Sequence, residues 1–313
     1  MSLFNKILSP RLPATALSLD GHSATMVQLE RNRGAFALRR AATAAMPEGL
    51  LKPDFTEVNI TDPERLADFL AHLSESAGLT RQSKWSVALP EACAATHVLT
   101  LETKPASRQE ADEVLRWKTE RAFGTPYESL RSVRERIPAD MSGRERYLAV
   151  GMRLSVLDEY EEVFAMLGWK AGFIAPRHVG EARWLNGKKG ATGDALLISA
   201  HREGFTALVQ RNGQPFILRS VPCELADRDD ELFRLLLFYR DRTGPADEVA
   251  VPLNRLLVVG EDPDRQSIAK VVNETLSTNL RALTPPEVGL NLPDAQLNFA
   301  AIAAPAGLAA LAW

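Results

Sequence analysis

The segment 17-LSLDGHSATMVQLE-30 decides the fold, because it predicts two β-strands joined by a tight turn. Residues 16–19 are apolar, a turn of small residues follows, and residues 26–30 alternate between apolar and polar side chains. A second turn at residues 31–34 leads to a third expected strand at residues 36–40. The chain therefore opens with an antiparallel meander of three strands.

The same plan recurs roughly 180 residues later, a spacing too long for a solenoid repeat. Residues 195–198 are apolar, and further strands are expected at residues 205–210 and 215–221 on either side of a second turn. Gln28 and Gln210 each stand near the end of the middle strand. We therefore expect two related halves that each begin with a meander.

The segments between the meanders alternate between helical and strand patterns, which predicts a mixed α/β chain. Helical periodicity is present in residues 62–76, 107–123, 155–167, 229–241 and 263–276. Strands are expected at residues 85–89, 97–101, 132–137, 147–152, 171–174 and 256–259. Ser107 and Ser155 are the expected N-caps of two helices. A polar, Gly-rich stretch at residues 186–190 divides the chain into a first half, 1–186, and a second half, 187–313.

Composition excludes several classes of function. A net charge of −3 over 313 residues gives no broad positive field to attract nucleic acid. Cys93 and Cys223 lie in no metal-ligand spacing, so we expect no metal site and no disulfide framework. The sequence contains no P-loop or GxGxxG motif. A nucleophile elbow at residues 20–24 is incomplete because Thr25 replaces its second Gly, so a hydrolase is not expected.

The order of these pieces resembles the PilM family of type IV pilus assembly proteins, which have an actin-like, ribonuclease H-like fold. The resemblance rests on four stretches: 17-LSLDGHSATMVQLE-30 with 46-MPEG-49; 87-VALP-90 with 115-LRWK-118 and 126-PYE-128; 157-LDEYEEVFAMLG-168 with 175-AP-176; and the second meander with 256-LLVVG-260. Together they extend over nearly the whole chain. No single stretch is a strict motif, so the order carries the resemblance.

The resemblance implies a small subdomain inserted into the first half at about residues 86–152. It also implies a non-enzymatic scaffold in the cytoplasm, which a partner protein holds at the inner membrane. That partner is a PilN-like protein with a single membrane span, whose cytoplasmic tail binds in a groove next to the inserted subdomain. Other pilus or secretion proteins are further expected partners. The cytoplasmic domain of type II secretion protein L looks similar, so a secretion system is an alternative.

ATP-binding members of this fold carry an Asp in each of two phosphate-binding turns, with Gly nearby so that backbone amides reach the phosphates. In this chain Ser18 and Ser199 occupy the Asp positions, and Asp20 and His201 occupy the Gly positions. Eight residues make up these vestigial turns: Ser18, Asp20, Gly21, Ser23, Thr25, Ser199, His201 and Gly260. Thr25 stands where a phosphate-binding Lys is expected. We therefore predict no cofactor, no catalytic residue and no metal.

Two classes of function follow from these residues. The first is a nucleotide-free scaffold. The second is an ATP-binding, actin-like switch that uses Mg²⁺, since Asp20 lies on the same strand face as Ser18 and remains within reach of a cation. Trp117 and Phe123 on one expected helix are either a partner-binding pair or part of a packed core.

Overall fold

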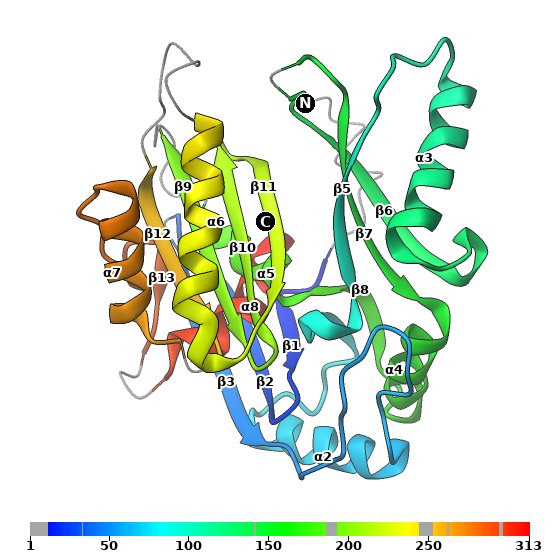
Figure 1. Ribbon diagram of the computed structural model, residues 1–313. Helices are drawn as coiled ribbons and strands as arrows, with labels where there is room; N and C mark the ends of the chain where they lie inside the picture. Colours follow the sequence, from blue (N-terminus) through cyan, green and yellow to red (C-terminus); the bar gives the residue numbers. More distant parts are fainter. Residues whose placement is uncertain are drawn as a thin grey trace.

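Strands of the first half and one short strand from residues 290–291 form a six-stranded sheet, as the computed structural model shows (Figure 1). The structure describes residues 12–32, 34–140, 142–185, 193–243, 253–261, 263–293 and 297–313. The strands of this sheet are β1 (Thr15–Leu19), β2 (Ser23–Asn32), β3 (Ala35–Ala45), β4 (Lys84–Leu89), β8 (Lys170–Pro176) and β13 (Leu290–Asn291). Their order is β13-β3-β2-β1-β4-β8, with β1, β2 and β3 antiparallel and β4 and β8 parallel to β1.

The second half repeats this arrangement in a four-stranded sheet of order β11-β10-β9-β12. Its strands are β9 (Asp194–His201), β10 (Gly204–Arg211), β11 (Gln214–Pro222) and β12 (Leu253–Gly260). The strand register makes the duplication explicit, because Ser18 pairs with Thr25 in the first half and Ser199 pairs with Thr206 in the second. The expected actin-like, duplicated fold is thus confirmed.

A separate three-stranded sheet, of order β5-β7-β6, forms the inserted subdomain. It consists of β5 (Ala95–Thr100), β6 (Leu130–Ile137) and β7 (Arg146–Arg153), and helix α3 (Arg108–Phe123) packs on it through Leu115 and Phe123. Because β4 lies in the first sheet, the part of the chain with its own sheet begins at Ala95, later than residue 86. Trp117 is 53% exposed whereas Phe123 is buried, so the two aromatic side chains do not act as a pair.

Helices cover the outer faces of both main sheets. α2 (Pro63–Ser76) and α4 (Leu154–Met166) pack on the first sheet, and α6 (Arg228–Thr243) and α7 (Arg265–Leu276) pack on the second. Ser107 caps α3 as expected, with its hydroxyl 3.1 Å from the amide of Glu110. The expected cap at Ser155 is wrong: β7 runs directly into α4, and Arg153 takes the N-cap position without a side-chain hydrogen bond.

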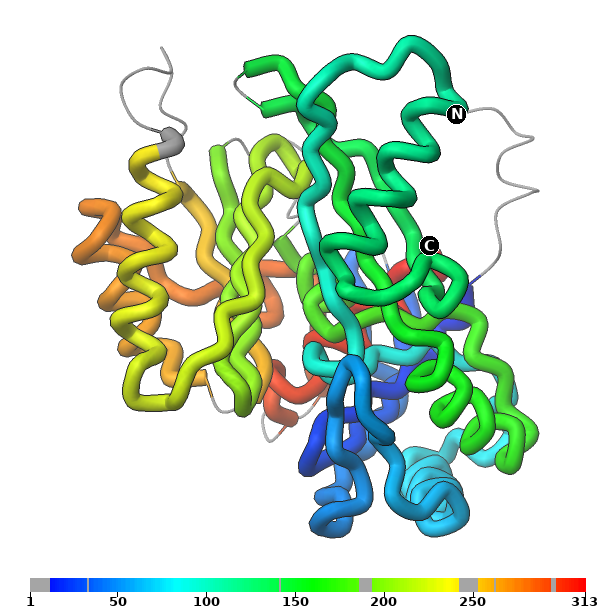
Figure 2. The backbone as a smooth tube through the Cα atoms, turned by 45° about the vertical axis from the view of Figure 1, so that its right-hand side comes forward, coloured from blue at the N-terminus to red at the C-terminus, as the bar shows by residue number. Residues whose placement is uncertain are grey.

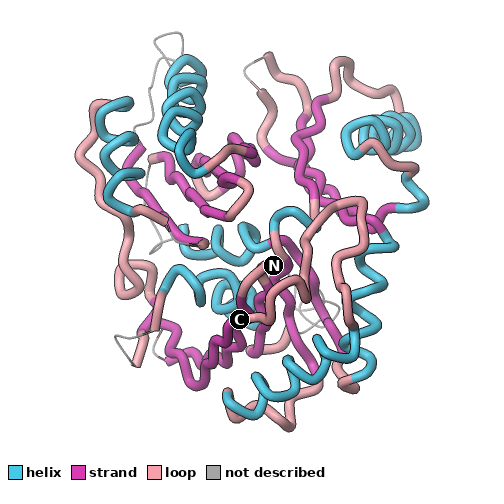
Figure 3. Tube along the Cα trace, turned by 60° about the horizontal axis from the view of Figure 1, so that its bottom comes forward, coloured by secondary structure: helices cyan, strands magenta, loops and turns pink. Residues whose placement is uncertain are grey.

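Two helices lie between the main sheets and join the halves: α5 (Arg177–Glu181) and α8 (Phe299–Ala309) (Figures 2 and 3). They cross at two glycines, since a Cβ on Gly307 would overlap the carbonyl oxygen of Gly180. α8 contacts β1, β2 and β4 as well as β12, so the end of the described chain returns to the first half. The expected boundary at residues 186–190 lies outside the described residues. Within the described part of the chain, no helix is long and apolar enough to cross a membrane.

Candidate functional site

In the first vestigial turn, the Asp20 carboxylate binds the backbone amides of the turn. Asp20 Oδ1 accepts hydrogen bonds from the backbone amides of His22, at 3.0 Å, and Ser23, at 2.6 Å. Its Oδ2 accepts from the Ser23 hydroxyl at 2.8 Å and from the Arg177 guanidinium at 3.1 Å. Successive backbone amides in a turn form a natural anion site. Here the anion is the Asp20 side chain, so both of its oxygens point into the protein.

Arg177, at the start of α5, is buried and joins Asp20 to a second carboxylate. Its Nε lies 3.6 Å from Glu181 Oε1, and Glu181 is completely buried. Burial raises the pKa of Glu181, and the Arg177 charge and the Ser199 hydroxyl only partly offset this effect. Burial and then the Asp20 charge raise the pKa of Glu261, which follows β12. Three carboxyl groups, those of Asp20, Glu181 and Glu261, therefore lie near Arg177 at the base of the cleft between the two turns.

The second vestigial turn has the same register but different chemistry. His201, at the end of β9, is nearly buried, and its Nδ1 lies 3.4 Å from Glu203 Oε2. Arg228 from α6 donates to the His201 carbonyl oxygen at 3.0 Å. Gly260, one of the eight predicted vestigial residues, has φ +103°, and a Cβ there would overlap the carbonyl oxygen of Ala200. Close packing of β12 against β9 is sufficient to require this glycine.

Two contacts join the two halves across the cleft, Arg202 with His22 and Thr206 with Glu91. Arg202, in the second turn, lies 2.7 Å from Nε2 of His22 in the first. Glu91 follows β4, pairs with His178 of α5 at 2.8 Å, and accepts from Thr206 of β10 at 3.4 Å. Burial opposes ionisation of Glu91, but the His178 charge and hydrogen bonds from His178 lower its pKa to about 2.

A polar cavity of about 310 Å³ remains between the turns, lined by Gly21, His22, Lys52, Arg202, Glu261 and neighbouring residues. Of the eight predicted residues, Gly21 and His201 line this cavity. Ser18 and Ser199 are buried, and the Ser199 hydroxyl interacts with Glu181, whose pKa it lowers. Thr25 does not face the cavity, because its hydroxyl lies 3.0 Å from that of Thr43 on β3. Among the described residues, no group of three or more His, Cys, Asp or Glu side chains could hold a metal ion.

Sequence reasoning missed Arg177, Glu91 and His178, which make the central ionic contacts. The stretch 175-AP-176 was recognised, but the charged residues that follow it were not. A possible signal was the charged sequence 177-RHVGE-181 directly after an apolar strand. Charged side chains in such a short helix between two halves have few ways to reach solvent, so they must pair.

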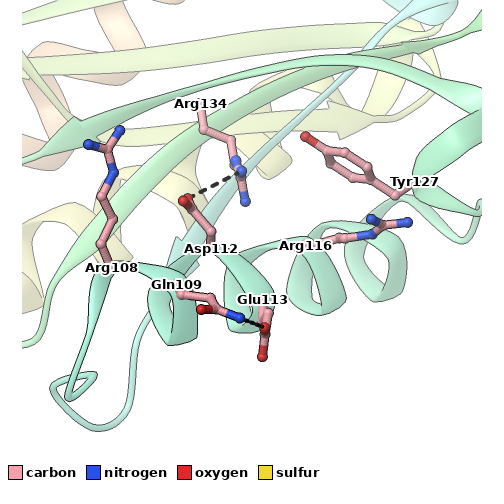
Figure 4. Close-up of a pocket in the computed structure, with 7 residues that line it drawn as sticks. All are labelled: Arg108, Gln109, Asp112, Glu113, Arg116, Tyr127 and Arg134. Carbon is pink, nitrogen blue, oxygen red and sulfur yellow. Dashed lines mark hydrogen bonds and ion pairs between the residues drawn. The ribbon is translucent and has the colours of Figure 1, made fainter.

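A second hollow lies on the inserted subdomain, between α3 and the edge strand β6, with a volume of about 480 Å³ (Figure 4). Tyr127 lies at one end, with the Arg116 guanidinium 5.1 Å and the Arg134 guanidinium 5.8 Å from its ring centre. Arg134 and Asp112 point toward each other across the groove, 3.9 Å apart. The groove therefore combines an aromatic ring, charges of both signs and an open strand edge.

The structure belongs to the actin-like class of folds. Within this class it matches a chain of the PilM–PilN type IV pilus biogenesis complex with a TM-score of 0.74 at 18% sequence identity, over 97% of this chain and 99% of that chain. The cytoplasmic domain of EpsL, an inner membrane component of the type II secretion system of Vibrio cholerae, matches at a TM-score of 0.45 and 12% identity, over 87% of this chain and 98% of that chain. No family model and no curated protein sequence matches the chain. The first match establishes a PilM-like fold.

Proposed function

We propose that this protein is a non-enzymatic scaffold for type IV pilus assembly, or for a related secretion system, in the cytoplasm beside the inner membrane. The observation that carries the proposal is the shared fold, because the PilM–PilN match extends over 97% of this chain. Its partner is a PilN-like membrane protein with one span, which offers a short cytoplasmic tail. Other components of the machine bind the assembled pair.

The occupied first turn supports a scaffold that works without ATP. The amides of His22 and Ser23 are already satisfied by Asp20, and Glu261 brings a further carboxyl group to the cleft. A polyphosphate would have to displace Asp20 and approach several carboxyl groups of like charge. The contacts of Arg202 with His22 and of Thr206 with Glu91 then hold the halves together in place of a nucleotide.

The groove between α3 and β6 is the proposed site for the tail. β6 lies at the edge of its sheet, so an extended peptide can add to it through backbone hydrogen bonds. The Tyr127 ring supplies a contact surface, and Arg134 and Asp112 supply partners for charged groups on the peptide. This location agrees with the groove beside the inserted subdomain that the family resemblance implies.

A titration of the full chain with a fluorescent peptide tests this proposal. The peptide is the cytoplasmic tail of a single-span protein encoded beside this chain, and we expect a dissociation constant on the order of micromolar. Tyr127→Ala should weaken binding about tenfold, since an aromatic contact is a typical hot spot. Trp117→Ala is the matched control, because Trp117 is exposed on α3 outside the groove. Equal affinity of both variants for the tail would exclude the groove, and no binding by the unmodified chain would exclude this partner.

A further inference from the structure

Phe36 on β3 is buried, and two arginines and Trp313 lie around its ring. The Arg31 guanidinium lies 6.0 Å from the Phe36 ring centre, and that of Arg183 lies 5.6 Å from it. The Trp313 ring lies 5.8 Å from the same ring. Strand pairing fixes Arg31 opposite Phe36, and Arg183 belongs to the short helical turn that follows α5. We call Arg31, Phe36, Arg183 and Trp313 the Phe36 patch.

Within the described part of the chain, the two arginines of the Phe36 patch lack a carboxylate partner. Neither forms an ion pair with any carboxylate that the structure describes, whereas Arg177, Arg211 and Arg281 each do. Burial lowers the pKa of Arg183, and the positive charge of Arg31 lowers it further. Two neighbouring guanidiniums that repel each other make a site where an external anion is bound favourably.

Apolar side chains lie next to these charges at the surface. Trp313 is 50% exposed and Leu311, in the same helical turn, is 38% exposed. Trp has an apolar ring with one polar N–H group, which suits it to the boundary between lipid and water. Arginine side chains likewise pack their apolar stems against hydrophobic surface while the guanidinium stays in the polar layer.

We propose that the Phe36 patch binds the phosphate groups of anionic lipids and so places this face of the protein directly on a membrane. Arg31 and Arg183 bind headgroup phosphates, and Trp313 with Leu311 enters the headgroup region. A lipid surface fits better than an acidic peptide, because exposed apolar side chains and unpaired arginines lie side by side on one surface. This inference does not depend on the pilus partner or on the state of the cleft.

Sedimentation of the full chain with vesicles tests the proposal. We expect binding to vesicles that contain phosphatidylglycerol, no binding to phosphatidylcholine alone, and release at high salt. Each surface arginine contributes about a fivefold factor to binding, so Arg31→Gln with Arg183→Gln should weaken it about thirtyfold. Arg65→Gln with Arg81→Gln removes the same charge from exposed positions elsewhere and serves as the control. If the double variant folds poorly, Arg31→Gln alone is measured instead, because Arg31 is exposed and its replacement should not disturb folding.

Three results would overturn the inference. Equal losses in the Phe36 patch variant and the control would mean that only overall charge matters. Full binding by Trp313→Ala together with tight binding of inorganic phosphate would indicate a site for a free anion. Binding of an oligoglutamate peptide, with no binding to anionic vesicles, would indicate an acidic protein partner.

Discussion

The two turns that face each other across the cleft have the same backbone register but are stabilised by different chemistry. In the first turn, the Asp20 carboxylate accepts from two backbone amides and pairs with Arg177. In the second, His201 occupies the equivalent position, close to Glu203, and Arg228 binds its carbonyl oxygen. The first turn thus depends on a buried charge and the second mainly on packing and a hydrogen bond to its backbone. This difference predicts unequal responses to mutation.

The largest effect is expected at Glu91, because this buried residue joins His178 of α5 to Thr206 of β10. Glu91→Ala leaves His178 buried without its partner and should lower the free energy of unfolding by about 3–5 kcal/mol. Chemical denaturation followed by tryptophan fluorescence measures the change. A loss below about 1 kcal/mol would show that the pair contributes little and that the turns are held independently.

The same pair predicts a pH dependence. Glu91 has a folded pKa of about 2, below its ordinary 4.5, so its stabilising effect is present above about pH 4.5 and is lost as the pH falls towards 2. His178 has a raised pKa, so its contribution is complete below about pH 6.5 and is lost as the pH rises through its folded pKa. Stability from this pair is therefore greatest between these values. In a plot of the free energy of unfolding against pH, Glu91→Gln should reduce the loss of stability at acid pH. An unchanged loss at acid pH would mean that other carboxylates cause it.

Replacing the equivalent residues Asp20 and His201 tests whether the two turns contribute unequally to stability. Asp20→Ala leaves two amides without their acceptor and leaves Arg177 with Glu181 alone as its ion partner, so we expect a loss of about 3 kcal/mol. His201→Ala removes a partly exposed contact with Glu203 and a 3.5 Å contact with the Thr206 hydroxyl, and should cost about 1 kcal/mol. Parallel urea titrations of the two variants measure the difference. Equal losses would mean that the buried charge of the first turn has no special role.

The positions of the two equivalent turns could be predicted from the sequence, but the interactions that stabilise each turn could not. Alternation and turn residues were sufficient to place both meanders and to align Ser18 with Ser199. The similarity of Gln28 and Gln210 was misleading: with the serines aligned, the two glutamines are one position out of step, since Gln28 pairs with Thr15 and Gln210 with Ala195. A short motif near the end of a strand does not fix the strand register, whereas the type and length of the turn do.

The ionic contacts of the cleft lay beyond sequence reasoning for a physical reason. Arg177 reaches Asp20 across 157 positions, and Thr206 reaches Glu91 across 115. Local patterns report which face of an element is buried, but not which distant charges meet there. The expected cap at Ser155 was wrong for a related reason, because the end of β7 sets where α4 begins.

The smallest predicted effect tests directly whether Asp20 takes the place of a phosphate. Asp20→Gly frees the amides of His22 and Ser23 beside Arg177, so an external anion should bind weakly where the unmodified chain binds none. At a tripolyphosphate concentration equal to the dissociation constant, stabilisation is about 0.4 kcal/mol, or roughly 1 °C in Tm. Asp20→Asn retains an acceptor in the turn and serves as the control that should not respond. If the unmodified chain gains as much Tm as Asp20→Gly, Asp20 must swing out of its turn freely, and the ATP-dependent switch becomes the better account of this cleft.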